Sequence, residues 1–180
     1  MKKIAEITQR KLKWSQPKAL QREFELRADG ELVATLKFRS AWGSLAIAES
    51  ADGCWTFKRV GFWQTKATIR ALGSDTDVAV FNNNTWANGG TLVLRDGRKY
   101  PATSNFWQTQ CQFQTEQGTP LILMKTGGFI HQSADIQIEP AAIAVTDLPW
   151  IVMFGMYLVV GMSEDAAAVG GVTACVAAFC

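Results

Sequence analysis

The chain has 180 residues, of which 48% are apolar and 19% are charged, and its formal net charge is +2. This composition excludes a disordered, collagen-like or long coiled-coil chain, and the small net charge argues against nucleic acid as a partner. All 18 Lys and Arg lie at or before Lys125, so the last 41 residues form a segment of different character.

The N-terminal residues predict a cytoplasmic protein. Residues 1–6 (M-K-K-I-A-E) are basic but lack the apolar run of a signal peptide. The four cysteines show no C-x-x-C spacing. We therefore expect reduced thiols that act as small apolar side chains.

Alternation of apolar and polar residues with a period of two dominates residues 10–139. In the run from Leu20 to Arg27, Leu20, Phe24 and Leu26 share one face, and Arg22 is the one charged residue in phase with them. We count about twelve such short runs, which predict antiparallel strands with one polar and one apolar face in a sandwich or a barrel. Dipeptides typical of hairpin turns separate several runs: Asp29-Gly30, Asp52-Gly53 and Asp96-Gly97.

Residues 148–162 (L-P-W-I-V-M-F-G-M-Y-L-V-V-G-M) predict a helix that is buried on every side. Asp147 can cap its start, and Pro149 lies in the first turn, where a missing N–H is harmless. The side chains expected to form the core of the protein are Trp150, Ile151, Met153, Phe154, Tyr157 and Leu158.

Either lipid or protein could bury this helix. Fifteen residues span about 22 Å, which is short of a hydrocarbon core of ~30 Å, and no Lys or Arg flanks the segment. A barrel of about twelve strands has room for a helix ~10 Å across. We therefore predict a mainly β protein, a closed antiparallel barrel of about twelve strands with an apolar C-terminal helix threaded through it. A membrane span is the alternative.

This arrangement resembles the tubby-like and LURP-one-related superfamily, to which the phospholipid scramblases are similar. The matching phrases are W-T-F-K-R-V-G-F at 55–62, G-S-D-T-D-V-A-V-F at 73–81, G-G-T-L at 89–92, S-N-F-W at 104–107 and E-P-A-A at 139–142. The resemblance covers roughly residues 10–163 and implies a barrel domain over residues 1–163. Because its motifs are structural, it is more specific for the fold than for an activity.

The tail 164–180 departs from that resemblance. It is rich in Ala and Val, and we expect Gly170-Gly171 to break any helix there. Because the tail is so apolar, we expect it to pack on the exterior or rim of the barrel, or to mediate self-association.

The sequence holds little that points to catalysis. It contains no P-loop, no G-x-S-x-G and no H-E-x-x-H motif, and His131 is the only imidazole. His131, Ser133 and Asp135 lie too close in one strand segment to converge on one point, because adjacent strand residues face opposite ways. We expect no enzymatic activity, no metal site and no cofactor.

Basic residues are the stronger indication of function, because tubby-like domains bind phosphoinositide head groups on a basic patch. The resemblance therefore implies a non-catalytic module that binds anionic lipid or a small ligand, peripheral to a membrane. An ordinary solvated face is the alternative. The candidate ligand-binding residues, which outward faces of neighbouring strands could join, are Lys58, Arg59, Lys66, Arg70, Arg95, Arg98 and Lys99.

Two further hypotheses stay open. The chain could be a protein-interaction scaffold whose helix merely completes the core, or a membrane protein anchored by residues 147–180. Four tryptophans expected at strand ends or loops are either membrane-surface anchors or plugs of the barrel ends. They are Trp42, Trp63, Trp86 and Trp107.

Overall fold

The computed structural model describes the backbone of residues 1–19, 21–61, 66–84, 89–105, 109–127 and 131–177, and side chains as far as Ala167. Twelve strands follow one another as an antiparallel meander, and β1 pairs with β12 to close a barrel. The predicted fold class is confirmed. The strands are β1 (Leu12–Ser15), β2 (Glu23–Ala28), β3 (Glu31–Phe38), β4 (Ala46–Ser50), β5 (Gly53–Val60), β6 (Lys66–Ala71), β7 (Asp77–Asn83), β8 (Gly89–Leu94), β9 (Lys99–Ser104), β10 (Gln110–Gln114), β11 (Pro120–Gly127) and β12 (Ser133–Ile138).

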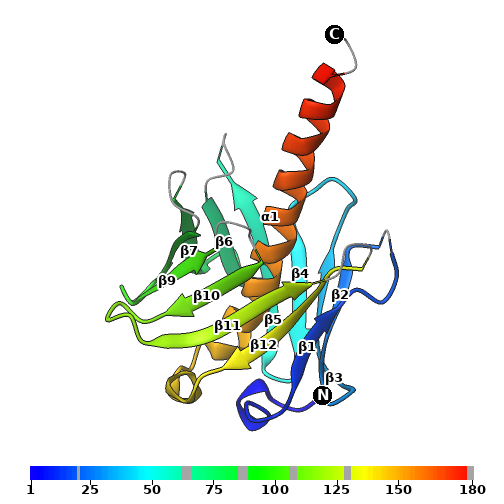
Figure 1. The fold of residues 1–180 in the computed structure, drawn as a ribbon. Helices are drawn as coiled ribbons and strands as arrows, with labels where there is room; N and C mark the ends of the chain where they lie inside the picture. The colour runs from blue at the N-terminus through cyan, green and yellow to red at the C-terminus, as the bar shows by residue number, and fades with distance from the viewer. Residues whose placement is uncertain (20, 62–65, 85–88, 106–108, 128–130, 178–180) are drawn as a thin grey trace.

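One long helix, α1 (Leu148–Ala177), runs up through the barrel and leaves it at one end (Figure 1). We call this the exit end; it carries the connections that follow β1, β3, β5, β7, β9 and β11. The opposite, entry end carries the hairpin turns and two 3-10 helices, η1 (Ile4–Glu6) and η2 (Pro140–Ala144), which bury Ile4 and Ala142. The Ile4 N–H donates to Asp52 (2.9 Å), so the N-terminal segment is tied to the turn before β5.

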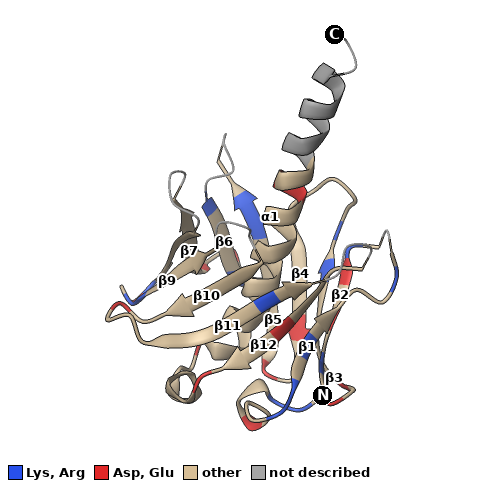
Figure 2. Ribbon diagram, viewed as in Figure 1, with Lys and Arg blue, Asp and Glu red and all other residues tan. Residues whose placement is uncertain are grey.

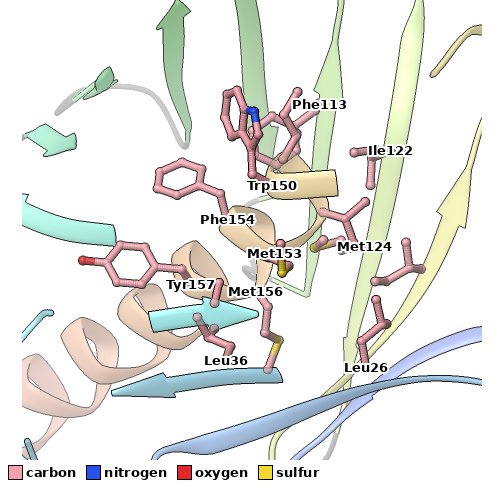
Figure 3. Packing of buried hydrophobic residues seen from close by; sticks show 14 of the residues in the cluster. Leu26, Leu36, Phe113, Ile122, Met124, Trp150, Met153, Phe154, Met156 and Tyr157 are labelled. Atoms are coloured by element: carbon pink, nitrogen blue, oxygen red, sulfur yellow. The ribbon is translucent and has the colours of Figure 1, made fainter. Parts of the chain in front are cut away.

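The helix supplies much of the protein core. Trp150, Ile151, Met153, Phe154 and Tyr157 are all buried, as predicted. They pack against inward side chains of the strands, among them Leu26, Leu36, Phe113, Ile122 and Met124 (Figure 3). Leu158, which we expected to be buried, is only partly so. It faces a small cavity at the exit end.

Protein, not lipid, surrounds the first half of α1. The window Leu148–Ala167 is long and apolar enough for a membrane span, but 61% of it is buried inside the structure. The alternative prediction, a membrane anchor formed by residues 147–180, is therefore wrong for the part of α1 inside the barrel. The apolar residues of that part fill the interior of the barrel, as predicted.

The helix does not end near Met162 as predicted. It continues to Ala177, and Gly170-Gly171 do not break it. Each glycine costs only about 1 kcal/mol relative to alanine, whereas extending an existing helix adds one hydrogen bond per residue. Alanines on both sides favour that extension.

Candidate functional site

A large cavity lies at the exit end, beside the last buried turns of α1. Its volume is about 430 Å³. The wall comes from residues at the ends of strands and from the 39–45 connection, and the other side comes from Tyr157, Gly161, Glu164 and Asp165 of the helix. A smaller cavity of about 60 Å³ lies nearby and shares Arg59 and Asp165 with the first. Both cavities thus lie where the barrel leaves space around the emerging helix.

Arg22, just before β2, joins three parts of this site. Its guanidinium lies 3.9 Å from the ring centroid of Phe38, as in a cation–π contact. Nη1 donates to the carbonyls of Gly43 (2.7 Å) and Ser40 (2.9 Å), so it holds the 39–45 connection in place. Nη2 lies 2.8 Å from both carboxylate oxygens of Glu164. Nε is buried and has no hydrogen-bond partner among the described residues.

Arg59, near the end of β5, points inward because it is in phase with the buried Phe57. Its Nη1 lies 2.9 Å from Asp165 Oδ1, and its side chain is 18% exposed. The guanidinium lies against Gly161 so closely that a Cβ at this position would overlap it. Gly161 therefore lets Arg59 cross the helix and reach a carboxylate on the next turn.

Tyr157 and Phe38 form the apolar floor of the cavity. Their rings stack with centroids 5.6 Å apart and an interplanar angle of 10°. The Tyr157 hydroxyl donates to the carbonyl of Ser44 (2.8 Å). Burial raises the pKa of Tyr157 to about 12, so this hydroxyl stays a neutral donor at physiological pH. Trp42 stands at the rim with 98% of its surface exposed.

The two guanidinium groups of the site are suited to an anion or a planar polar group, and its other ionisable side chains are Tyr157, Glu164 and Asp165. Guanidinium forks bind carboxylates and phosphates through two parallel hydrogen bonds. Among the described residues, no group of three His, Cys, Asp or Glu side chains could hold a metal ion. His131 Nδ1 lies 3.2 Å from the carbonyl of Gln16, and Ser133 Oγ donates to the carbonyl of Gly127, so each interacts with backbone elsewhere.

The seven predicted ligand-binding residues do not form one patch. Lys58, Lys66 and Arg70 lie on the outer face of β5 and β6, where Arg70 pairs with Asp77 (2.5 Å). Arg59 alone of this group turns into the barrel. Lys66 also borders the smaller cavity.

The other predicted residues, Arg95, Arg98 and Lys99, lie at the entry end, a strand length of about 20 Å away. Arg98 pairs with Asp96 and Asp147, both at 2.7 Å, and these carboxylates raise its pKa further above the usual range. Lys99 lies 3.7 Å from Glu116. Arg98 thus helps to fix the start of α1, whereas Arg59 lines the cavity.

Three charged residues of the site were absent from the predicted set: Arg22, Glu164 and Asp165. The alternation in β2 carried a signal for Arg22, because a charged residue in phase with Phe24 and Leu26 must face the barrel interior or its end. Glu164 and Asp165 are two of the only three acidic residues after residue 139. Their position, one turn beyond the apolar run, was the corresponding signal.

Comparisons with protein-family models, with curated proteins and with solved structures give no match to this chain. The closed twelve-stranded barrel around a C-terminal helix is established by the structure. Membership of the tubby-like superfamily stays a prediction from the resemblance.

Proposed function

We propose that this chain is a non-catalytic β-barrel module that binds an anionic group, of the kind carried by lipid head groups, in the exit-end cavity. One observation carries the proposal: Arg22, just before β2, and Arg59, on β5, line the same cavity of about 430 Å³. A phosphate or carboxylate between them would receive hydrogen bonds from two guanidinium groups.

In the structure, two carboxylates of α1 form ion pairs with these arginines. Glu164 pairs with Arg22 and Asp165 pairs with Arg59, and both carboxylates are partly exposed, at 44% and 66%. Exposed ion pairs contribute only about 0–1 kcal/mol each, so a phosphate group with two negative charges can replace them. Glu164 and Asp165 therefore act as competitors of the ligand.

Lysines outside the barrel would strengthen the attraction of an anionic membrane. Lys58 and Lys66 lie on the neighbouring strands β5 and β6, and both are exposed. Figure 2 shows basic residues on these two strands near the exit end. Each basic residue near an anionic membrane surface contributes about 1 kcal/mol. In this proposal the protein is cytoplasmic and peripheral, and its partner is the head group of an anionic lipid.

Glycerol 3-phosphate is a suitable soluble probe, because it carries the phosphate of a lipid head group without acyl chains. We expect it to raise the melting temperature of the full chain, since a ligand that binds only the native state stabilises it. Arg59→Gln should weaken binding at least tenfold. The matched control is Arg70→Gln, which loses the same charge and an ion pair on the outer face. It should respond like the wild type.

The competitor carboxylates provide a second, opposite test. Glu164→Gln combined with Asp165→Asn should tighten binding of glycerol 3-phosphate, because both arginines lose their anionic partners. Failure of the probe to stabilise either the wild type or this variant would overturn the proposal. Vesicles that contain phosphatidic acid then separate the two sources of the phosphate group: tighter binding to vesicles than to the soluble probe identifies a lipid.

A further inference from the structure

The connections at the two ends of the barrel differ sharply in composition. Each of the five hairpin connections at the entry end contains an acidic residue (Figure 2). The six connections at the exit end, residues 16–22, 39–45, 61–65, 84–88, 105–109 and 128–132, contain no Asp or Glu in their sequence. The acidic residues of the entry-end connections are Asp29, Asp52, Asp75, Asp96 and Glu116.

Aromatic residues show the opposite distribution. By sequence, five of the six exit-end connections contain Trp or Phe, and four of the seven tryptophans of the chain belong to them. Trp42 is the tryptophan of these connections that lies within the described residues, and it is 98% exposed. Trp63, Trp86 and Trp107 lie outside the described residues. Tryptophan is the residue most typical of the membrane–water interface.

The helix leaves the barrel through this same end and stays apolar. Beyond Asp165 its backbone remains helical to Ala177, and Ala166–Ala177 contains no charged residue (Figure 1). Twelve helical residues extend about 18 Å. That length exceeds one half of a hydrocarbon core of ~30 Å.

The charges at the base of this segment are already paired. Glu164 and Asp165 are the last charged residues of α1, and Arg22 and Arg59 contact them at 2.8 and 2.9 Å. No unpaired carboxylate therefore stands between the barrel and the apolar segment. By sequence, the exit-end connections offer aromatic, uncharged and basic residues, and the two carboxylates of α1 beside them are paired with arginines.

We propose that the exit end lies on a lipid bilayer, with Trp42 at the interface and Ala166–Ala177 of α1 inserted among the acyl chains. The charge of the exit end favours lipid over a second copy of this chain. Arg22 and Arg59 are paired with Glu164 and Asp165, but two exit ends would still bring together connections that contain Lys18 and Arg39 and no acidic residue, so they would repel one another. Because insertion depends on apolar contact, it goes beyond binding of an anion in the cavity and does not require it.

Flotation with vesicles of uncharged phosphatidylcholine tests this proposal. We expect the full chain to float with these vesicles. A chain that ends at Asp165 should lose at least about tenfold in binding, because the inserted apolar surface is gone. Its thermal unfolding should remain cooperative, since Ala166 and Ala167 lie exposed outside the barrel.

Single substitutions at the two ends of the barrel provide a matched pair. Trp42→Ala should weaken flotation several-fold. Leu72→Ala removes an exposed apolar side chain, 49% exposed, from the entry end and should leave flotation unchanged. Val172→Glu places a charge within the inserted segment and should act like the truncation.

Three results would overturn the inference. In the first, the wild-type chain stays in solution when vesicles are present. In the second, the truncated chain floats as well as the wild type. In the third, the wild type does not bind vesicles but forms a concentration-dependent dimer, which truncation at Asp165 abolishes. The last result would assign the segment to self-association. Arg59→Gln separates this inference from the proposed function, because it should lose glycerol 3-phosphate binding while it still floats with uncharged vesicles.

Discussion

Met124 of β11 fills the space beside Gly155 of α1 that any larger side chain at position 155 would need. A Cβ built on Gly155 would lie 2.6 Å from Met124 Sδ and 3.3 Å from Phe113 Cε2, both of which belong to fully buried residues. The glycine lets the helix backbone approach the barrel wall at mid-height. The fit between helix and barrel therefore depends on this contact.

Gly155→Val should destabilise the protein. Overpacking of a filled core costs about 1–3 kcal/mol, and valine recovers less than 1 kcal/mol through its better helix propensity. Gly155→Asp should prevent folding, because it buries an unpaired carboxylate. Urea unfolding followed by circular dichroism measures both effects. A Gly155→Val chain as stable as the wild type would mean that Met124 can move aside freely.

Gly161→Ala should separate stability from ligand binding. The atoms that a Cβ would meet belong to the guanidinium of Arg59, the far end of a flexible side chain near the surface. We expect an unchanged or slightly higher melting temperature, because alanine favours the helix by about 1 kcal/mol. Binding of glycerol 3-phosphate should weaken, since Arg59 must leave its position in the cavity. Calorimetric titration of the variant and the wild type checks this result.

Truncation at Asp147 should abolish the folded barrel. Each large side chain that α1 buries contributes about 1.5–3 kcal/mol, and the loss of Trp150, Met153, Phe154 and Tyr157 with their neighbours exceeds a net stability of ~5–15 kcal/mol. A thermal scan by circular dichroism should show no cooperative transition. The chain truncated at Asp165 is the matched control. A cooperative melt of the shorter chain would show that the barrel stands without its helix.

The phenol groups of both tyrosines should ionise at a higher pH in the folded protein than in the unfolded chain. Burial raises the pKa of Tyr157 to about 12, and it also raises the pKa of Tyr100. The folded state then holds the phenolic proton more tightly than the unfolded state, whose tyrosines titrate near pH 10. This contribution to stability is complete below pH 10 and is lost as the pH rises toward 12. Absorbance at 295 nm at pH 10.5 should show less tyrosinate in buffer than in guanidinium chloride, where about three quarters of the tyrosine side chains are ionised. Equal titration in both solvents would contradict the burial of Tyr157.

Local patterns in the sequence predicted the strands and most of their inward faces, because alternation is a property of each strand alone. Asp29 and Gly30 both adopt positive φ angles, 47° and 89°, as the predicted hairpin turn requires. The pattern failed where pairing shifts by one residue. In the sequence, Leu32 alternates in phase with Ala34 and Leu36, which predicts that Leu32 faces the core. Val33 is buried instead, and the register of β2 with β3 shifts between Leu26 and Arg27. No local pattern reports such a shift.

The apolar pair Val78 and Val80 predicts in the same way that these two residues face the core on β7. The structure buries Ala79 and Phe81 instead, and the pairing of β6 with β7 shifts between Ile69 and Arg70.

The site was harder to predict than the strands. Arg59 and Arg98 looked equivalent in the sequence, and only the lengths and order of the strands place them at opposite ends of the barrel. Glu164 meets Arg22 across 142 positions of the chain, a contact that follows from the path of the helix.

The position of α1 after all twelve strands has a consequence for biosynthesis. Ribosomes add about 5–20 residues per second, so the strands emerge seconds before the side chains that fill the barrel. Until then the sheet has open edges at β1 and β12, and the apolar side chains on its inner face lack the helix against which they pack. Leu12 and Ile136 must also find each other across most of the chain. We expect slow folding after synthesis, during which the nascent barrel depends on chaperones that shield its open edges.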